Sequence, residues 1–330
     1  MKAVQFDRFG DPAEVLAVRD IPKPVPARGQ VLVRMIASPV NPSDLMYVAG
    51  KYGLSPDALP ATPGFEGVGV VEASGGGFLG WLRKGKRVAV LNDTRGNWGE
   101  YAVTSARQVI PVPADIPDAQ AASFFVNPAS ALVMTQHILK VPAGAWLLQS
   151  AAGGELGKMV IRLGKKFGFK TLNLVRRREQ VEELKKLGAD VVLVEGDGPI
   201  PDQVRAHSAG GVKYAIDPVG GATGTGVIQS LAADGQCLLY GTLSGEPITL
   251  EPRLLMTGGK SVHGFWLGGW AKRQGVFTML RLIRRIRVLL REGVLTTEVA
   301  AEYPLDRVAD AVRHAASAAR GGKVLLRIGT

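Results

Sequence analysis

A short stretch near the N-terminus, VNPSDLMYVAGKYG at residues 40 to 53, has side chains suited to catalysis without a metal. It holds Asn41 and two tyrosines, Tyr47 and Tyr52, and contains no cysteine or histidine. A tyrosine hydroxyl is neutral at pH 7, because its reference pKa is about 10, and it can donate a hydrogen bond to an oxygen on which negative charge develops. Such a group would need a cofactor bound elsewhere in the chain to supply the reacting electrons.

The other polar residues of this stretch have a structural explanation. Ser43 and Asp44 suit the first turn of a helix that begins after Pro42, where these residue types cap free backbone N–H groups. Metal-ligating residues are scarce, because the only cysteine is Cys237 and the four histidines are scattered along the chain (His137, His207, His263 and His314). We therefore expect no internal disulfide, no zinc and no other metal site.

The glycine-rich stretch SAAGGELG, residues 150 to 157, follows an apolar run and leads into a helical pattern. Starting at Ala152 it is A-x-G-x-x-G, a dinucleotide-binding fingerprint with alanine as its first residue. The middle glycine would let the backbone approach a pyrophosphate, and the last would allow close helix packing. We predict that this turn binds a cofactor, the alternative being a structural glycine turn. The residues concerned are Ala152, Gly153, Gly154, Glu155, Leu156 and Gly157.

The strand that follows the fingerprint ends in NLVRRR, residues 173 to 178. NAD would favour an acidic residue about twenty positions beyond the fingerprint, and the sequence has none there. Guanidinium groups suit a 2′-phosphate through paired, charge-assisted hydrogen bonds, so Arg176, Arg177 and Arg178 predict NADPH as the cofactor. Alternatively, the three arginines start a solvated helix and form ion pairs with Glu179, Glu182 and Glu183.

Two regions with different sequence patterns would position the tyrosines and the cofactor-binding residues. Residues 1 to about 118 contain short extended segments broken by glycine and proline, as in an irregular β-rich domain. From about residue 119, apolar runs alternate with helical patterns that begin near Lys158 and Arg178, which predicts an α/β doubly wound parallel sheet. The predicted strands are residues 31 to 37, 67 to 75 and 86 to 92 in the first region, and 145 to 151, 171 to 175, 191 to 194, 214 to 217 and 237 to 241 in the second.

Two further loops close predicted strands of the second region, DPVGG at 217 to 221 and YGT at 240 to 242. Ligands of open α/β sheets bind beyond the carboxyl ends of the strands, so we place Tyr240 and Gly241 at the cofactor. The final strand, residues 322 to 328, has no helix after it and is free to return to the first domain.

Length and composition indicate two globular domains, since the chain has 330 residues of which 46% are hydrophobic. No apolar run approaches the roughly 18 to 20 residues of a membrane-spanning helix, and the N-terminus does not look like a signal peptide. We expect a cytoplasmic protein with no membrane partner.

The formal net charge is +11, and many basic residues lie in a helical stretch from Lys272 to Arg291. Apolar residues alternate with them at roughly helical spacing, which predicts a surface helix with a buried stripe and a solvated basic face. The expected stripe is Phe277, Leu280, Ile283, Val288 and Leu289. The alternative is a face that recognises anionic groups; no basic-aromatic nucleic-acid motif is present, so we expect no nucleic-acid partner.

Together these residues resemble the medium-chain dehydrogenase/reductase superfamily over nearly the whole chain. The resembling motifs are MKAV, GQVLVRM, PGFEG, GKRV, WGEY, the fingerprint, DPVGG and GKVLLRI. The resemblance implies a GroES-like catalytic domain at residues 1 to 118 and 263 to 330, and a Rossmann NADPH-binding domain at residues 119 to 262. Zinc alcohol dehydrogenases would have cysteine near Asn41, histidine at Phe65 and four cysteines between residues 90 and 101, so the chain resembles the zinc-free branch.

A finer resemblance is to the mitochondrial-type 2-enoyl thioester reductases, through NPSD with GKY, VNPASA, NLVRR, YGTLS and GFWL. It implies that Tyr52 lies at the active site and that Asn41 and the Val-Asn-Pro stretch lie near the nicotinamide. Without it, Tyr52 would be read as an ordinary aromatic. The resemblance adds Asn127, Ser130, Phe265, Trp266 and Leu267 to the cofactor site, with Phe265 and Trp266 alternatively in an acyl channel or the core. Gly153 and Gly154 depart from this family and are closer to the quinone oxidoreductases.

The activity implied is NADPH-dependent reduction of an α,β-unsaturated carbonyl, most simply a 2-enoyl thioester of CoA or of an acyl carrier protein. The alternative enzyme reduces quinones or free enones, and a third reading is a nucleic-acid-binding protein that retains the fold without the activity. On the first reading, the basic helix would meet the phosphates of CoA or an acidic carrier protein. A homodimer is expected from the resemblance alone.

Overall fold

The computed structural model describes residues 1 to 92, 96 to 317 and 321 to 329. It divides into two compact units, the first made of Met1–Val126 with Thr297–Thr330 and the second of Asn127–Thr296. We expected the second domain to span residues 119 to 262, whereas residues 119 to 126 lie with the first unit and residues 263 to 296 with the second.

Specific contacts explain why the segment before Thr297 stays with the second unit. The Arg162 guanidinium donates from Nε to the carbonyl oxygen of Val294 at 2.9 Å and from Nη2 to that of Thr296 at 2.5 Å. Lys166 pairs with Glu292 at 2.9 Å. These contacts join one helix of the second unit to a segment more than a hundred residues away, which local sequence patterns do not reveal.

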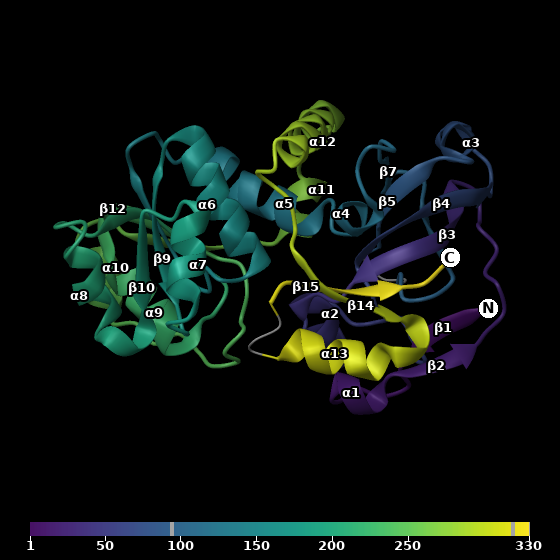
Figure 1. Ribbon diagram of the computed structural model, residues 1–330, viewed down its shortest axis with the longest axis horizontal. Coiled ribbons are helices and arrows are strands. Elements are labelled where there is room, and N and C mark those ends of the chain that lie inside the picture. The colour runs from purple at the N-terminus through teal and green to yellow at the C-terminus, as the bar shows by residue number, and fades with distance from the viewer. Residues whose placement is uncertain (93–95, 318–320, 330) are drawn as a thin grey trace. The chain divides into compact units, whose positions relative to one another are not determined.

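The first unit is built on a seven-stranded mixed sheet in the order β14-β15-β3-β4-β5-β7, with β6 paired to β3 (Figure 1). A separate antiparallel pair, β1 and β2, completes its strands. The elements are β1 (Lys2–Gln5), α1 (Pro12–Val15), β2 (Ala17–Asp20), β3 (Gln30–Pro39), α2 (Pro42–Val48), β4 (Glu66–Ser74), α3 (Phe78–Arg83), β5 (Arg87–Leu91), β6 (Tyr101–Ser105), β7 (Val109–Pro111), α4 (Asp118–Ala122), β14 (Val299–Pro304), η3 (Leu305–Arg307), α13 (Val308–Ala316) and β15 (Lys323–Arg327).

The second unit is a six-stranded, all-parallel sheet in the order β10-β9-β8-β11-β12-β13 (Figure 1). This is the doubly wound dinucleotide-binding order, which reverses direction between β8 and β11. The elements are α5 (Val126–Leu132), η1 (Val133–Ile138), β8 (Trp146–Gln149), α6 (Glu155–Phe167), β9 (Lys170–Val175), α7 (Gln180–Leu187), β10 (Val191–Val194), η2 (Glu195–Asp197), α8 (Ile200–Arg205), β11 (Val212–Asp217), α9 (Gly221–Gln229), β12 (Leu231–Leu239), α10 (Pro252–Met256), β13 (Ser261–Gly264), α11 (Leu267–Lys272) and α12 (Val276–Arg291).

The predicted α/β class and the doubly wound sheet are confirmed. Each predicted strand overlaps an observed one. In the second unit the agreement arises because buried parallel strands are short, nearly continuous apolar runs. The last strand, β15, returns to the first unit as predicted, where it pairs with β3. No helix among the described residues is long and apolar enough to cross a membrane.

The expected buried stripe of α12 is wrong for three of its five residues, since Phe277, Leu280 and Val288 are 77%, 57% and 38% exposed. Leu289 is buried as predicted and Ile283 is half-buried, and the other buried residues are Leu282, Ile286 and Leu290. Apolar residues occur on more than one face of this helix, and the 3.6-residue period fits two stripes equally well. The exposed face of α12 therefore carries apolar as well as basic side chains.

Candidate active site

The polar stretch of the first unit forms the N-terminus of α2. The backbone N–H of Asn41 donates to the Asp44 carboxylate at 2.7 Å, and the backbone N–H of Phe65 donates to the other oxygen at 2.9 Å. Asp44 thus closes a capping box and ties α2 to the segment before β4. The predicted helix start after Pro42 and the structural role of Asp44 are confirmed.

The side chain of Asn41 is held at both ends in the interior of this unit. Its amide nitrogen donates to Glu66 Oε1 at 3.1 Å, and its oxygen accepts from Lys323 Nζ at 2.6 Å. Glu66 also accepts from the backbone N–H of Val126 at 3.0 Å. Asn41 is 3% exposed, Glu66 2% and Lys323 4%. Asn41 therefore acts within this structure as the centre of a buried polar cluster made of Asn41, Asp44, Glu66 and Lys323.

The charges of this cluster strongly affect its protonation. Burial raises the pKa of the Asp44 carboxyl to about 7, although two backbone hydrogen bonds act in the opposite direction. Burial likewise raises the pKa of the Glu66 carboxyl, and the Lys323 ammonium opposes that rise. Two buried carboxyl groups share one ammonium, so a proton on one of them relieves an unbalanced charge.

The pH dependence of stability follows from the raised pKa of Asp44. Between its unfolded value of 3.8 and its folded value of about 7, the folded protein holds a proton that the unfolded chain has lost. The free energy of unfolding should therefore decrease as pH rises through this window. Urea unfolding of the wild type and of Asp44→Asn at pH 5.0 and pH 7.5 tests this, since the variant should lose part of the pH slope. Equal slopes in the two proteins would contradict it.

The structure separates the two tyrosines of the stretch. Tyr47 is 3% exposed and packs edge-on against Phe6 and Phe65, with ring centroids 5.8 and 5.3 Å apart. Burial raises the pKa of its phenol, and its hydroxyl has no hydrogen-bond partner among the described residues. Tyr52 is half-buried, with its ring 5.2 Å from that of Phe65. Only Tyr52 combines a supported ring with access from outside the core.

The predicted cofactor residues of the second unit gather at the carboxyl edge of its parallel sheet. The fingerprint follows β8, the arginines follow β9, and the other two loops follow β11 and β12. At the point where the strand order reverses, the Ser150 hydroxyl donates to the Asp217 carboxylate. Asp217 also accepts from the backbone N–H groups of Val219 at 3.2 Å and Gly220 at 2.8 Å. This joins the loops after β8 and β11 at the position where such sheets bind ligands.

The fingerprint turn has the close packing that its glycines predict. A Cβ on Gly157 would lie 2.5 Å from the carbonyl oxygen of Ala152 and 2.6 Å from its Cα, so α6 approaches the turn only because residue 157 is glycine. A Cβ on Gly154 would meet only the Ala151 oxygen, at 3.3 Å, and is otherwise in open space. Ala151 itself has φ of 49°, a left-handed conformation that costs a non-glycine residue energy.

These two glycines allow a matched pair of substitutions. Gly157→Ala should destabilise the protein by roughly 1–3 kcal/mol through overpacking against Ala152. Gly154→Ala should leave the unfolding midpoint nearly unchanged but weaken NADPH binding by about tenfold or more, because its methyl group would occupy the space for a pyrophosphate. Thermal unfolding and NADPH titration measure the two effects. Similar midpoints for both variants would contradict the steric argument.

The first turn of α6 is suited to an anion. Its backbone N–H groups have no acceptor within the helix and carry partial positive charge. The Glu155 carboxylate is buried beside them, but Lys158 Nζ lies 3.7 Å from it and 2.5 Å from Glu183. Lys158 therefore offsets a negative charge that would repel a pyrophosphate. With the open side of Gly154, the turn fits the predicted cofactor.

The three arginines after β9 have different surroundings. Arg178 pairs with Asp197, beyond the end of β10. Arg176 is exposed and Arg177 half-buried, and neither forms an ion pair with another residue in the described ranges. Two of the three glutamates that the alternative interpretation paired with the arginines have other partners, since Glu182 pairs with Lys185 and Glu183 with Lys158.

The loops after β11 and β12 lie against each other. The backbone N–H of Tyr240 donates to the backbone carbonyl oxygen of Asp217 at 2.9 Å, and a Cβ on Gly241 would lie 2.7 Å from the carbonyl oxygen of Pro218. Burial raises the pKa of the Tyr240 phenol, which remains neutral at physiological pH. The sequence placed Tyr240 and Gly241 at this edge, and the structure brings them to the switch-point loop.

The remaining predicted residues lie on short elements of the second unit. Phe265 is 9% exposed, so its side chain belongs to the core, whereas Trp266 is 46% exposed and caps α11, which begins at Leu267. Asn127 and Ser130 lie one turn apart on α5, half-buried and 6% exposed respectively. Contact of these residues with a cofactor stays a prediction.

No sequence motif identified Glu66, Lys323 or the buried polar network next to the fingerprint. In that network, Gln149 donates to the Gly157 oxygen at 3.0 Å and to Asn173 Oδ1 at 2.7 Å. The missed side chains are charged or amide groups within apolar strands: Glu66, Gln149, Asn173 and Lys323. A polar residue within an apolar run was the available signal, since buried polar groups need partners.

Comparison with known families agrees with this architecture. A model described as zinc-binding dehydrogenase matches residues 156 to 285, and one described as the alcohol dehydrogenase GroES-like domain matches residues 27 to 114. The mitochondrial enoyl-[acyl-carrier-protein] reductase of Rattus norvegicus is 34% identical over 310 residues, covering 92% of this chain and 83% of the relative. The chain belongs to the medium-chain dehydrogenase/reductase superfamily. The resemblance seen in its sequence is confirmed, and the protein is an oxidoreductase.

Solved structures of this superfamily share the complete fold. A protein described as an NADPH:quinone reductase from Bacillus thuringiensis matches with a TM-score of 0.91 and 32% identity, over 99% of both chains. The complex of Etr1p with NADP and crotonyl-CoA matches with a TM-score of 0.84 and 27% identity, also over 99% of both chains. Within the described residues, no group of three or more His, Cys, Asp or Glu side chains is placed to hold a metal ion.

Proposed function

We propose that the protein is an NADPH-dependent, metal-independent reductase of α,β-unsaturated carbonyl compounds, with a 2-enoyl thioester of CoA or of a carrier protein as its acceptor. The supporting observation is the similarity to enoyl reductases along 92% of the chain. The Etr1p structure with crotonyl-CoA supports the same acceptor class. We further propose that the protein works as a homodimer in the cytoplasm and needs no nucleic-acid partner.

Some residues of the chain would bind the cofactor, and others would stabilise the negative charge that develops on the acceptor. The α6 N-terminus and Gly154 would hold the pyrophosphate, and Arg176 and Arg177 the 2′-phosphate. When bound, the nicotinamide supplies the hydride for the β-carbon of the acceptor. The Tyr52 phenol would donate a hydrogen bond to the thioester carbonyl oxygen as negative charge develops there. Phe65 supports the ring of Tyr52, which limits the orientations of the phenol.

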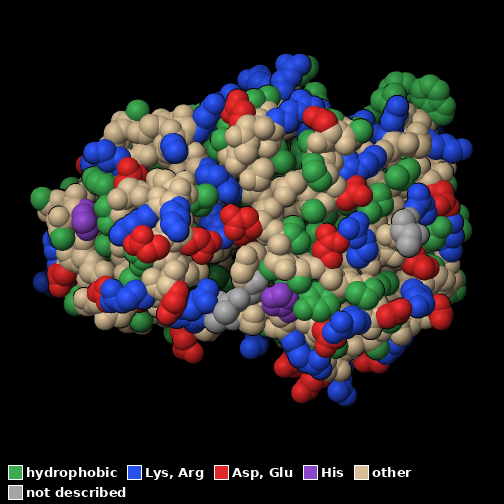
Figure 2. Space-filling model, viewed as in Figure 1, with side chains coloured by type: hydrophobic (Ala, Val, Ile, Leu, Met, Phe, Trp, Pro, Cys, Tyr) green, Lys and Arg blue, Asp and Glu red, His purple; other side chains and the backbone are tan. Residues whose placement is uncertain are grey.

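The exposed face of α12 supports an acceptor that carries phosphate or carboxylate groups. Between Glu251 and Glu292 the sequence contains no acidic residue. Arg281 and Arg284 are exposed on α12 and form no ion pair with any residue of the described ranges. Blue side chains gather over α12 at the top of Figure 2. Cationic groups without partners attract anionic ligands at long range, which would favour CoA or an acidic carrier over a neutral quinone.

The arginines after β9 give a prediction about cofactor choice. Arg176→Ala and Arg177→Ala should each weaken NADPH binding by about 10- to 100-fold, the value of a charge-assisted contact to phosphate, and leave NADH binding within about twofold. Arg178→Ala is the matched control, because Asp197 already occupies this side chain, and it should change NADPH affinity little. Fluorescence titrations with both cofactors measure these effects. Selective loss of NADPH affinity in Arg178→Ala alone would overturn the assignment.

The acceptor class is tested by steady-state assays with the purified protein. We expect oxidation of NADPH, one equivalent for each crotonyl-CoA reduced to butyryl-CoA, and much slower turnover with NADH. A simple quinone such as 1,4-benzoquinone serves as the competing acceptor. Rapid quinone reduction without crotonyl-CoA turnover would reject the thioester proposal.

Quinone reduction is the second candidate, favoured by two observations. The Gly153–Gly154 pair of the fingerprint is closer to quinone oxidoreductases, and the Bacillus thuringiensis structure has the higher TM-score of the two described above. Reduction of an enoyl thioester is completed when the α-carbon takes up a proton after hydride has reached the β-carbon. A quinone takes up its protons on oxygen, so it would need neither this protonation at carbon nor the basic face of α12. The same pair of assays decides between the two candidates.

A further inference from the structure

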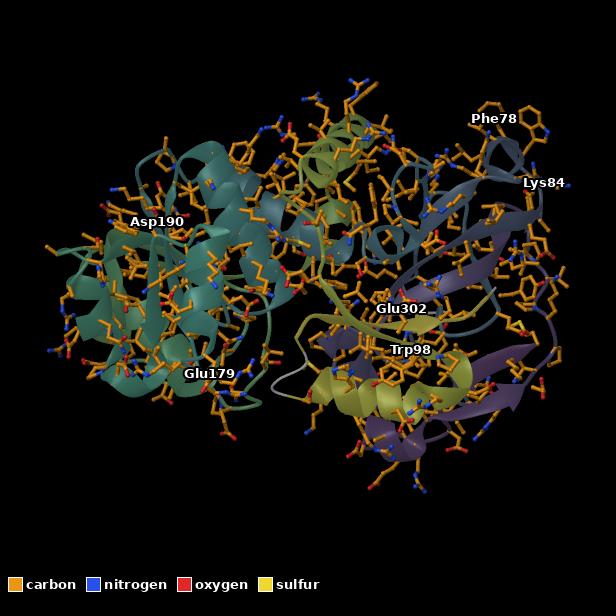
Figure 3. All side chains as sticks on the ribbon, viewed as in Figure 1. Phe78, Lys84, Trp98, Glu179, Asp190 and Glu302 are labelled. Atoms are coloured by element: carbon orange, nitrogen blue, oxygen red, sulfur yellow. The ribbon has the colours of Figure 1, made fainter. Side chains whose placement is uncertain are left out.

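A second surface of the molecule has no role in the proposed reaction. Helix α3, in the connection between β4 and β5 of the first unit, carries Phe78 at 75% exposure, Trp81 at 71% and Leu82 at 42%. These residues stand at positions i, i+3 and i+4 and so share one face of the helix. Figure 3 shows Phe78 and Lys84 at this tip, and Figure 2 shows the apolar side chains projecting at the upper right.

The exposure of these side chains is fixed by the way α3 is anchored. Leu79 packs against the core cluster beneath the sheet, and Gly80 is buried. A Cβ on Gly80 would lie 2.2 Å from Ser74 Oγ, so the helix lies close to the end of β4. With Leu79 and Gly80 facing inward, Phe78 and Trp81 must face outward. Their ring centroids are 6.4 Å apart.

The surroundings of α3 are cationic. Between Glu72 and Asp93 the sequence contains no acidic residue, and Lys84 and Lys86 are exposed directly after the helix. A hollow of about 540 Å³ beside α3 is lined by Phe78 and by two further exposed cations, Arg28 and Arg107. None of these four basic side chains forms an ion pair with a residue that the structure describes. The group made of Phe78, Trp81, Leu82, Arg28, Lys84, Lys86 and Arg107 is called the α3 tip below.

We propose that the α3 tip docks on the surface of a bilayer containing anionic phospholipids, with Phe78, Trp81 and Leu82 entering the interface and the basic side chains contacting the headgroups. Aromatic and leucine side chains beside Lys and Arg are the composition of interfacial anchors. The hollow lined by Arg28 and Arg107 has room for a headgroup phosphate. Such docking is peripheral and revises the expectation, drawn from the sequence, of no membrane partner.

The size and shape of the tip favour a bilayer over a protein partner. A specific protein interface buries about 800 Å² on each side and needs some 20 to 30 residues, whereas the apolar part of the tip is three side chains on one short helix. Self-association of this small patch through a two-fold axis would bring the basic side chains of both copies close together, at an electrostatic cost. A fluid interface needs no matching groove.

Vesicle co-sedimentation of the full-length protein tests the proposal. We expect binding to phosphatidylcholine vesicles that contain phosphatidylglycerol, little binding to pure phosphatidylcholine, and release by salt. Phe78→Ser with Trp81→Ser should lower the partition coefficient by about tenfold or more for each ring. Lys84→Glu with Lys86→Glu should lower it by about tenfold or more. Phe277→Ser is the matched control, 77% exposed on α12, and should bind like the wild type.

Tryptophan fluorescence gives a second readout, since Trp81 should shift to the blue on anionic vesicles and Trp81→Phe should lose that shift. Equal vesicle binding by the wild type and the Phe78/Trp81 variant would overturn the proposal, as would no preference for phosphatidylglycerol. A change of oligomeric state in the Phe78/Trp81 variant, without vesicle binding by the wild type, would identify a second copy as the occupant and also reject it. None of these outcomes depends on reductase activity.

Discussion

Tyr52→Phe is expected to lower kcat with crotonyl-CoA by about 100-fold or more, the usual effect of removing one hydrogen-bond donor from a developing oxyanion. The KM for NADPH should change little, because Tyr52 belongs to the first unit and the predicted cofactor turn to the second. Stability should also be preserved, since phenylalanine keeps the ring contact with Phe65, whose centroid is 5.2 Å away. Steady-state kinetics and thermal unfolding of the same preparations measure both effects.

Tyr47 provides the matched control for this prediction. It lies five residues earlier, carries the same phenol and contacts the same Phe65, but it is 3% exposed and its hydroxyl has no partner among the described residues. Tyr47→Phe removes a buried, unsatisfied hydroxyl, so kcat should stay within about twofold and stability should not decrease. If the two variants lost activity equally, the phenol of Tyr52 would have no special part in the reaction.

The elements of both units could largely be predicted because their signals are local. The strands of the second unit are short apolar runs such as residues 171 to 175, and the fingerprint glycines stand where a strand turns into a helix. Gly157 shows the agreement in detail, because the close packing predicted from its position is the contact with Ala152. Local pattern and tertiary structure specify the same conformation here.

The features that could not be predicted depend on long-range contacts. The Asn41–Lys323 hydrogen bond joins residues 282 positions apart, and Arg162 binds carbonyl groups more than 130 positions away. The predicted buried face of α12 was wrong for another reason. Two sets of apolar residues on this helix both fit the 3.6-residue period, and only packing decides which set is buried. The partner of Arg178, Asp197, also lies on a neighbouring strand connection rather than on the same helix.

The buried cluster around Asn41 is where these long-range contacts matter most for the active site. Asn41 caps the N-terminus of α2, Glu66 begins β4 and Lys323 begins β15, so the cluster joins three elements of the first unit at their ends. Tyr52 lies a few residues beyond α2, and its ring rests on Phe65, next to Glu66. The position of Tyr52 therefore depends on this buried cluster. In the sequence, its two members on strands are visible only as a glutamate and a lysine within apolar runs, Glu66 and Lys323.

Lys323→Met is expected to destabilise the protein by about 3–5 kcal/mol at pH 7.5, because it leaves the buried carboxyl groups of Glu66 and Asp44 without a balancing cation. Lys2→Met is the matched control, since Lys2 forms a 2.8 Å ion pair with Asp306 in the same unit, with side chains that are 49% and 59% exposed. An exposed pair of this kind contributes about 1 kcal/mol or less. Urea unfolding of both variants measures the difference, and equal losses would contradict the proposed role of burial.

The double variant Glu66→Gln/Lys323→Met separates a charge effect from a packing effect. If Lys323 stabilises the fold chiefly by balancing Glu66, a neutral glutamine should recover part of the loss, with a coupling of about 0.5–3 kcal/mol. Glutamine keeps an oxygen that can accept from the backbone N–H of Val126, as Glu66 does at 3.0 Å. If Lys323→Met destabilises the protein only because methionine packs poorly, the stability losses of Glu66→Gln and Lys323→Met should add in the double variant. Because the backbone N–H of Phe65 donates to Asp44 of this cluster and the Phe65 ring contacts Tyr52, recovered stability should be accompanied by recovered kcat. That result would link the charge balance of the interior to the position of the phenol proposed to act in catalysis.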